Sequence, residues 1–255
     1  MNKPCFPVTF LGAGPGDPEL ITVKGRRLLD GADVIVYAGS LVNPALLEGV
    51  RAKIYDSAGM DLDGIMVIMV EAARAGKKVV RLHTGDPAIY GAIREQMHRL
   101  DRENIGYEVV PGVSSALAAA AAVKAELTVP ELTQTVIFTR RAGRTPVPEQ
   151  ESLSNLAAVQ GSMCIFLSVS MMEQVVGELL AGGYPPATPV AVVEKATWPE
   201  ERIVRGTLVD IAGRIQASAI RKTAMILVGQ ALGKNDERVS KLYDAAFSHE
   251  YRSGK

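Results

Sequence analysis

The sequence carries no net charge and little cysteine, and both facts exclude classes of function. The 28 basic and 28 acidic residues cancel. We therefore expect no broad attraction to nucleic acid or to an anionic membrane, although a local basic cleft stays compatible with this balance. The two cysteines, Cys5 and Cys164, are far apart and form no CxxC or Cys/His cluster. This spacing argues against a structural zinc site and a disulfide framework, and a reducing cytoplasm fits it.

Long apolar runs and hydrolase motifs are absent as well. The most hydrophobic stretch, residues 65–70, is about a third of the ~20 residues that a membrane span needs. The N-terminus lacks the apolar segment of a signal peptide. The sequence has no G-x-S-x-G motif, and its histidines show no metal-binding spacing, so only His83, beside a glycine-rich turn, is of functional interest. We expect no membrane segment, no metal and no nucleophilic hydrolase.

What the sequence does contain is an alternation of short β-rich runs and helical patterns, typical of an α/β protein. In the first half, strands are predicted at residues 8–11, 34–37, 79–82 and 108–110, and helices at 23–29, 64–75 and 92–104. In the second half, strands are predicted at 135–139, 163–167, 190–193, 203–204 and 224–228. A helical stripe from Met171 to Leu180 is expected to end at Gly182-Gly183, with its paired methionines in the core.

Two domains and a tail are predicted from the punctuation of the chain. Pro111-Gly112 marks a chain reversal, and Ser114 or Ser115 is suited to cap the alanine-rich helix that follows. We therefore expect domains at residues 1–112 and 113–232, and a charged tail at 233–255. The polar, proline-rich residues 140–155 are predicted to form a loop. Within the tail, helical spacing is present at Leu242, Tyr243, Ala246 and Phe247.

The first glycine-rich loop, residues 12–18 (GAGPGDP), looks like a dinucleotide-binding turn but departs from it. A Rossmann fingerprint reads G-x-G-x-x-G, and its backbone N–H groups bind a pyrophosphate. Here Pro15 removes one donor, and Asp17 precedes Pro18, which biases it away from helical dihedral angles. The loop is thus stiff and rich in glycine but poorly suited to phosphate.

A second glycine-rich turn, residues 82–91 (LHTGDPAIYG), follows a predicted strand and precedes a helix. It should lie at the carboxyl end of that strand, the edge where open α/β sheets bind ligands. Gly85 would let a ligand approach the backbone, and Asp86 would offer a carboxylate. The alternative, at even odds from the spacing, is a structural turn in which Asp86 accepts backbone N–H groups.

Basic residues gather on two predicted loops, at Arg140, Arg141 and Arg144 and at Arg221 and Lys222. Solvated surface is one interpretation. The other is a guanidinium clamp for a polycarboxylate, because arginine donates paired hydrogen bonds to a carboxylate.

Several segments in fixed order resemble the tetrapyrrole methylases, which are S-adenosylmethionine-dependent C-methyltransferases of cobalamin and sirohaem biosynthesis. They are GAGPGDPELITVKG, ADVIVYAGSLV, VVRLHTGDPAIYG, VVPGVSS and VAVVEKATWPEE. The resemblance covers about residues 7–232. YAGSLV, DSAGM, AELTVPELTQTVIFTR, GRTPVPE, KATWP and SKLYD are similar to the branch that methylates C-11 of precorrin-4 or cobalt-precorrin-4.

The resemblance implies two α/β domains with the cofactor in the cleft between them, usually in a homodimer, and a small tetrapyrrole as substrate. It places the cofactor S-adenosylmethionine, and its product S-adenosylhomocysteine after methyl transfer, against eleven residues. These are Pro15, Thr84, Gly85, Asp86, Ile89, Ser114, Ser115, Leu167, Ala196, Thr223 and Ala224. The first loop would then face the macrocycle through Gly14, Gly16 and Asp17, and the five basic residues would grip its carboxylates. Positioning donor and acceptor requires no strong nucleophile.

One departure from the family narrows the reaction. Uroporphyrinogen methylases carry an aspartate after the VVY strand and a lysine near the following short strand. Here Ala38-Gly39-Ser40 follows VIVY, and the lysine position aligns roughly with Asp56. This favours a later corrin-ring methylation over the uroporphyrinogen reaction. Ser40 and Asp56 become candidates for orienting the macrocycle or relaying a proton, and the general base stays unassigned.

Two other functions stay open at this point. The opening glycine loop is the motive for a nicotinamide-dependent dehydrogenase, against which Pro15 argues. A non-catalytic tetrapyrrole-binding protein of the cobalamin pathway would bind pigment without transferring a methyl group.

Overall fold

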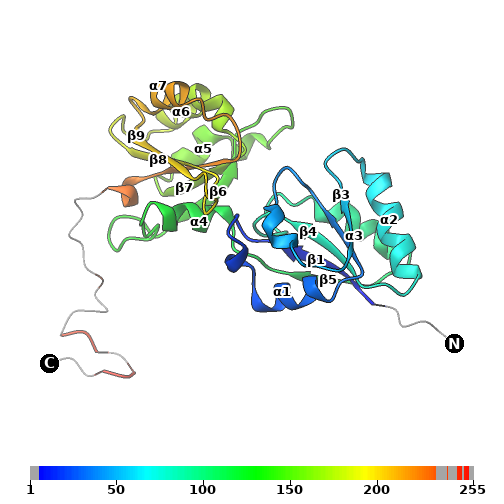
Figure 1. The fold of residues 1–255 in the computed structure, drawn as a ribbon. Helices are drawn as coiled ribbons and strands as arrows, with labels where there is room; N and C mark the ends of the chain where they lie inside the picture. Colours follow the sequence, from blue (N-terminus) through cyan, green and yellow to red (C-terminus); the bar gives the residue numbers. More distant parts are fainter. Residues whose placement is uncertain (1–5, 234–239, 241–245, 249, 253–255) are drawn as a thin grey trace. The chain divides into compact units, whose positions relative to one another are not determined.

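The computed structural model of the 255-residue chain describes residues 6–233, 240, 246–248 and 250–252 (Figure 1). They form two compact units, each with its own sheet. The first unit runs to Ala118 and also includes Lys195–Glu200, while the second comprises Ala119–Glu194 and continues from Glu201. The division falls within helix α4 (Ser115–Ala122), shortly after the boundary expected near residue 112.

The first unit is built on a parallel five-stranded sheet with the order β3-β2-β4-β1-β5. The central strands β1 and β4 are buried along their whole length, because helices cover both faces of the sheet. All the strands run in one direction, so their carboxyl ends meet at one edge. The strands are β1 (Val8–Gly12), β2 (Val34–Tyr37), β3 (Lys53–Asp56), β4 (Val79–His83) and β5 (Tyr107–Val110).

Neighbouring residues of β1 pack against different helices, as the alternation of a strand requires. Phe10 joins Met69 and Leu100 in the core beneath α2 (Leu62–Arg74) and α3 (Ile93–Arg102). Leu11 joins Leu29 of α1 (Val23–Asp30) in a separate core on the other face. Each of these fully buried side chains contributes about 1.5–3 kcal/mol to folding.

The second unit contains a mixed sheet with the order β6-β7-β10-β8-β9. Strands β6 and β7 are parallel, and the pairs β7–β10, β10–β8 and β8–β9 are antiparallel. Three helices share one hydrophobic core with β7, β8 and β10. The strands are β6 (Val136–Arg140), β7 (Ser162–Phe166), β8 (Pro189–Glu194), β9 (Arg202–Thr207) and β10 (Ala224–Val228), and the helices are α5 (Leu153–Ala157), α6 (Met172–Ala181) and α7 (Ile211–Ser218).

Short 3₁₀ turns complete the connections. They are η1 (Pro18–Leu20), η2 (Pro44–Leu47), η3 (Glu149–Glu151), η4 (Val169–Met171) and η5 (Gln230–Leu232).

The predicted elements are confirmed in place and type, with corrections at specific points. Strand β3 was not among the predicted strands. Helix α5 begins at Leu153, inside the stretch predicted as loop at 140–155, so the end of that loop prediction is wrong. Gly183, at φ +104°, takes the left-handed conformation after α6. Of the paired methionines, Met172 is buried in the core and Met171 lies half-buried.

The helical spacing in the tail involves two residues that the structure describes and two that it does not. Leu242 and Tyr243 lie outside the described residues, whereas Ala246 and Phe247 are described and are not helical.

Candidate functional site

Three loops meet at the carboxyl edge of the first sheet, after β1, β4 and β5. Strand β1 lies between β4 and β5, so the three loops are neighbours. The chain leaves β1 toward β2 on one side and leaves β4 toward β5 on the other, with α1 and α3 on opposite faces. Such a reversal of direction is the place where open α/β sheets bind ligands. The topology therefore supports this edge as the candidate site.

Backbone hydrogen bonds join the first glycine-rich loop to the second glycine-rich turn. The backbone N–H of Gly14 donates to the carbonyl of Gly85 at 3.2 Å, and the N–H of Gly85 donates back to Gly14 at 2.7 Å. Ala13 donates to the carbonyl of His83 at 2.7 Å. Gly14 and Gly85 hold φ values of +79° and +60°, a conformation that favours glycine. The N–H groups of Ala13 and Gly14 are thus engaged within the protein and are not free for a dinucleotide pyrophosphate.

Asp86 ties the second loop to the third. Its Oδ1 accepts the N–H of Ala88 at 2.8 Å, and its Oδ2 accepts the N–H of Gly112 at 3.0 Å. A Cβ atom on Gly12, at the end of β1, would lie 2.6 Å from the Cα of Gly112, so the backbones of the first and third loops approach each other as closely as glycine allows. The structural alternative for Asp86 is the one observed, since both carboxylate oxygens accept backbone N–H groups.

The other predicted cofactor residues of this edge are placed around that joint. Thr84 is exposed beside Gly85, and Ile89 is half-buried. The hydroxyl of Ser114 accepts the N–H of Ala116 at 3.3 Å, which leaves Ser115 as the first residue of α4. The structure brings these residues together at one edge, and their contact with a cofactor stays a prediction.

The tip of the first loop contacts a segment distant in sequence. The Nε1 of Trp198 donates to the carbonyl of Pro15 at 2.9 Å, and the N–H of Asp17 donates to Oγ1 of Thr197 at 3.0 Å. The Nδ2 of Asn43 donates to the carbonyl of Gly16 at 2.9 Å. Trp198, Thr197 and Asn43 are not among the predicted site residues, although the KATWP motif and the single tryptophan of the chain are sequence signals for the first two.

Asp56 and Ser40 lie at the ends of β3 and β2. The Oδ1 of Asp56 accepts two backbone N–H groups, from Gly39 at 2.9 Å and from Ala58 at 2.9 Å. These hydrogen bonds, from Ala58 and then from Gly39, lower the pKa of Asp56 below its ordinary value. Ser40 is exposed on the same turn as Gly39. This environment favours an orienting carboxylate over a general base, because a lowered pKa weakens a base.

A buried arginine lies beneath this part of the edge. Arg81 of β4 donates to Oε1 of Gln96 at 3.2 Å, to the carbonyl of Val36 at 3.2 Å and to Oγ of Ser57 at 3.0 Å. These acceptors are all neutral, and burial lowers the pKa of Arg81 to about 10. His83, two residues further, is buried, and burial followed by the charge of Arg81 lowers its pKa to about 3. The imidazole is therefore neutral near pH 7.

In the second unit, the register of the sheet gathers four strand ends at one edge. Arg140 at the end of β6 pairs with Phe166 at the end of β7, and Ala224 at the start of β10 pairs with Glu194 at the end of β8. Leu167 directly follows β7, and Thr223 directly precedes β10. Both take left-handed backbone conformations at φ +54°. The predicted cofactor residues Leu167, Thr223 and Ala224 therefore share one edge, while Ala196 lies in the segment assigned to the first unit.

The basic residues predicted to grip a substrate divide into two groups. The guanidinium of Arg140 donates to carbonyls of its own loop, at Thr145 and Pro146. Arg141 forms a 2.7 Å ion pair with Glu178 of α6. The remaining candidates, Arg144, Arg221 and Lys222, are exposed. These three have the freer side chains for an external carboxylate.

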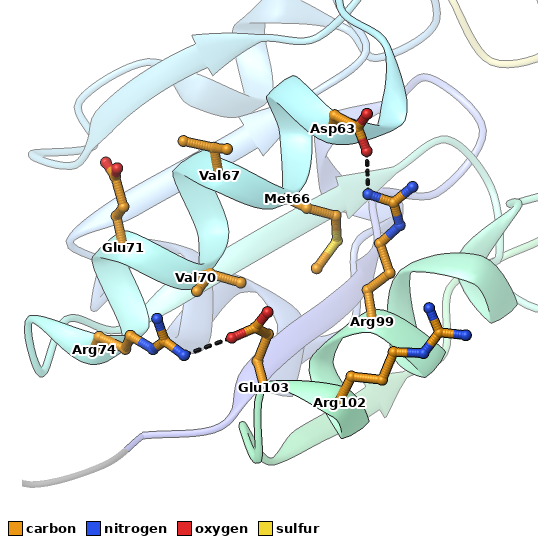
Figure 2. Close-up of a pocket in the computed structure, with 9 residues that line it drawn as sticks. All are labelled: Asp63, Met66, Val67, Val70, Glu71, Arg74, Arg99, Arg102 and Glu103. Atoms are coloured by element: carbon orange, nitrogen blue, oxygen red, sulfur yellow. Dashed lines mark hydrogen bonds and ion pairs between the residues drawn. The ribbon is translucent and has the colours of Figure 1, made fainter.

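A separate pocket of about 520 Å³ lies between α2 and α3, away from all the predicted site residues (Figure 2). Met66, Val67 and Val70 line it on the α2 side. Ion pairs from Arg99 to Asp63 and from Arg74 to Glu103 connect the two helices across it. These pairs stabilise the packing of α2 on α3, and the pocket presents no hydroxyl or thiol group for chemistry.

Among the described residues, no three His, Cys, Asp or Glu side chains gather closely enough to hold a metal ion. Every helix within the described ranges is too short or too polar to cross a membrane.

Comparison with known proteins agrees with this geometry. The family model of tetrapyrrole (corrin/porphyrin) methylases matches residues 7–212. The cobalt-precorrin-4 C(11)-methyltransferase of Methanocaldococcus jannaschii is 58% identical over 96% of this chain and 95% of its own length.

Solved structures give the same result. The X-ray structure of a cobalt precorrin-4 methyltransferase of cobalamin biosynthesis superimposes with a TM-score of 0.87 at 52% identity, covering 89% of this chain and 95% of that one. A uroporphyrin-III C-methyltransferase from Thermus thermophilus, complexed with S-adenosylhomocysteine, gives a TM-score of 0.76 at 30% identity, covering 89% of this chain and 99% of that one. The chain therefore belongs to the tetrapyrrole (corrin/porphyrin) methylase family.

Proposed function

We propose that the protein transfers a methyl group from S-adenosylmethionine to C-11 of precorrin-4 in its cobalt-containing or metal-free form, in cobalamin biosynthesis. The similarity to the cobalt-precorrin-4 enzyme of M. jannaschii along nearly the whole chain carries this proposal. Two of the compared proteins have names that contain cobalt, which makes cobalt-precorrin-4 the first substrate to test.

The residues at the edge of the first sheet fit such a cofactor. Gly85, in a left-handed conformation, exchanges backbone hydrogen bonds with Gly14 and so fixes the turn that carries Thr84. Thr84 is exposed beside it and Ser115 is half-buried, and both hydroxyls can hydrogen-bond a ribose or an amino-acid group. We propose Thr84, Gly85, Ile89 and Ser115 as direct contacts, and Pro15, Asp86 and Ser114 as residues that hold the loops in place.

In the second unit, we propose Leu167, Thr223 and Ala224 as cofactor contacts. Ala196, in the segment assigned to the first unit, is proposed as a further contact. Leu167 is the most informative of these, because its side chain is 69% exposed while its backbone is held in a left-handed conformation. Its apolar side chain, at the end of a strand, is therefore accessible for contact with the cofactor.

When bound, S-adenosylmethionine supplies an activated methyl group on a sulfonium, so the chain's own task is to align the acceptor carbon with it. Gly14 and Gly16 are buried against Leu20 and Trp198, so we propose the half-buried Asp17 as the residue of the first loop that faces the macrocycle. Asp56 and Ser40 orient the acceptor, and the exposed side chains of Arg144, Arg221 and Lys222 bind its carboxylates. Arg140 and Arg141 contribute less directly, because they are engaged with Pro146 and Glu178.

Assembly and location belong to the same proposal. We propose a homodimer, in line with the family resemblance, and a location in the cytoplasm, in line with the low cysteine content. Sedimentation velocity over a hundredfold concentration range tests the dimer, and a monomer at every concentration would refute it.

Two rival functions make different predictions. A nicotinamide-dependent dehydrogenase needs backbone donors in the first loop, and the N–H of Gly14 is engaged with Gly85. A non-catalytic tetrapyrrole binder would bind pigment without methyl transfer. Calorimetric titration with S-adenosylhomocysteine and with NADH distinguishes the first rival, since we expect micromolar binding of the former and none of the latter.

The decisive experiment is methyl transfer itself. Purified protein, ¹³C-methyl S-adenosylmethionine and cobalt-precorrin-4 or precorrin-4 should give a product with one new methyl, located at C-11 by NMR. Thr84→Ile should weaken S-adenosylhomocysteine binding at least tenfold, while Thr135→Ile, the same enlargement at an exposed position outside the site, should not. Methylation at another carbon, or pigment binding with no transfer, would overturn the proposal.

A further inference from the structure

Gly16 is in direct contact with the indole of Trp198. A Cβ atom at position 16 would overlap the indole, falling inside van der Waals contact of Cδ1 and Nε1 and 2.9 Å from Cγ. The tip of the first loop therefore has a face that only glycine permits, and the chain's single tryptophan covers that face. Gly16 itself is buried.

Two hydrogen bonds flank this contact. Trp198 donates to the carbonyl of Pro15 at 2.9 Å, on one side of Gly16. Thr197 accepts the N–H of Asp17 at 3.0 Å, on the other side. Adjacent residues of the Lys195–Glu200 segment thus bind the residues immediately before and after Gly16. A contact of this kind fixes both the position and the tilt of the loop tip.

The Lys195–Glu200 segment is itself constrained. Lys195 and Thr197 adopt left-handed conformations at φ +47° and +70°, which are unfavourable for residues with a side chain. The ammonium of Lys195 lies 5.4 Å from the centre of the Trp198 ring and 3.6 Å from a carboxylate oxygen of Glu200. A strained segment that presents an aromatic ring to one loop is consistent with selection for that loop's position.

The hydrophobic cores of the first unit do not include Trp198. They are formed by residues such as Phe10, Met69 and Leu100 on one face and Leu11 and Leu29 on the other. Replacing the indole by another ring should therefore alter the loop tip while both faces of the sheet remain packed.

We propose that Trp198 and Thr197 are positioning residues that set the Pro15–Asp17 loop for the tetrapyrrole acceptor. The inference rests on the proposed function, because it assigns the loop to the acceptor. Asn43 holds the carbonyl of Gly16 at 2.9 Å, so the loop retains one anchor when the Trp198 side is altered. Loss of Trp198 or Thr197 should displace the loop and weaken acceptor binding without reaching the Thr84–Gly85 turn.

The test combines a spectroscopic and a kinetic measurement. Protein labelled with 5-fluorotryptophan has a single ¹⁹F resonance, which reports the environment of the indole directly. Gly16→Ala should shift this resonance in the free protein, because the added methyl group displaces the ring. Thr197→Val removes the hydroxyl acceptor with little change of shape, and Thr197→Ser retains it.

The kinetic expectation is a selective loss. Trp198→Phe and Thr197→Val should each raise the KM for cobalt-precorrin-4 by about three- to tenfold, the effect of one hydrogen bond, with the Kd for S-adenosylhomocysteine within about twofold of wild type. Thr197→Ser should restore most of the loss. Glu200→Gln, which alters the same segment without touching the loop, is the matched control and should resemble wild type in both constants.

The outcomes separate this inference from the proposed function. If the wild-type protein methylates the acceptor and Trp198→Phe and Thr197→Val match it in KM, the positioning role is wrong. An equal loss in KM and in S-adenosylhomocysteine affinity would also overturn it, since that indicates general disorder of the unit. If Gly16→Ala fails to fold, the Trp198 and Thr197 variants still decide. A wild type that transfers no methyl group refutes the proposed function instead, whereas the ¹⁹F measurement still reports whether Gly16 and Trp198 are in contact.

Discussion

Asp86 joins two strand ends of the first sheet by accepting the backbone N–H of Gly112 at 3.0 Å while its other oxygen accepts that of Ala88 at 2.8 Å. Asparagine has only one side-chain acceptor, so Asp86→Asn leaves one of these N–H groups opposite an NH₂ group. We expect the free energy of unfolding to fall by about 1–3 kcal/mol, measured by urea denaturation. The control is Asp30→Asn, which removes an exposed ion pair with Arg26 and should cost at most about 1 kcal/mol. Equal effects at both positions would argue against the structural role of Asp86.

Gly112 is expected to tolerate no side chain. A Cβ atom there would overlap the carbonyl oxygen of Gly85 and lie 2.8 Å from the Cα of Gly12, and none of these is the movable end of a side chain. Gly112→Ala should therefore lower the unfolding midpoint severely or prevent accumulation of folded protein. Gly177→Ala is the matched control, since nothing lies within 4 Å of an added Cβ in the middle of α6. That variant should be stabilised by about 0.5–1 kcal/mol, because alanine favours a helix over glycine.

Replacements of Asp56 can separate its charge from its hydrogen bonds. Its Oδ1 accepts the N–H groups of both Gly39 and Ala58, and an asparagine Oδ1 can do the same. If Asp56 orients the acceptor by holding these turns, Asp56→Asn should keep kcat within about threefold of wild type, while Asp56→Ala loses both hydrogen bonds and activity. A fall in kcat of a hundredfold or more for Asp56→Asn would instead indicate proton transfer by this carboxylate. Initial rates over a range of pH measure the difference.

Arg81 should be more important for stability than any exposed arginine of the same unit. Arg81→Met would leave the carbonyl of Val36 and the side chains of Gln96 and Ser57 without their donor in a buried setting. We expect a loss of about 1–3 kcal/mol in the free energy of unfolding. Arg74→Met, which breaks only the exposed pair with Glu103, should change it by less than about 1 kcal/mol. If the two variants unfold at the same urea concentration, the buried hydrogen bonds of Arg81 contribute nothing measurable.

The sequence predicted the strands and helices whose own residues show an apolar pattern. Residues 34–37 and 224–228 are almost entirely buried β-branched or long apolar side chains, and both strands have the predicted bounds. Strand β3 lies at the edge of its sheet with three of its residues exposed, so Lys53–Asp56 shows no apolar pattern. Helix α5 was hidden by the polar residues before it, although Leu153 and Ala157 are buried on one side.

The candidate site was predictable only where its residues are neighbours in sequence. The two glycine-rich turns after strands indicate the ligand-binding edge, because the residues that make a turn lie together in the chain. Whether Asp86 faces a ligand or Gly112 is decided by a hydrogen bond between the loops that follow β4 and β5, which spacing alone cannot supply. The hydrogen bond of Trp198 to Pro15 connects positions 183 residues apart, so no local pattern announces it.

His83 should make stability depend on pH in the acidic range. Burial, followed by the charge of Arg81, lowers its pKa from 6.5 to about 3, and its Nε2 has no hydrogen-bond partner among the described residues. The unfolded chain binds a proton below pH 6.5 that the folded protein does not bind until about pH 3. The stabilisation is therefore complete above pH 6.5 and is lost as the pH falls, at up to about 1.4 kcal/mol per pH unit.

Urea unfolding of wild type and His83→Gln at pH 7 and pH 4.5 measures this contribution. Wild type should lose about 2–3 kcal/mol more than the variant across that interval, because only wild type has the buried imidazole whose protonation favours unfolding. His98→Gln, the same replacement at an exposed position of α3, is the control for the substitution itself. The same loss in wild type and in His83→Gln would mean that other groups cause the acid sensitivity. A proton on His83 would then be accommodated in the fold, which the neighbouring charge of Arg81 opposes.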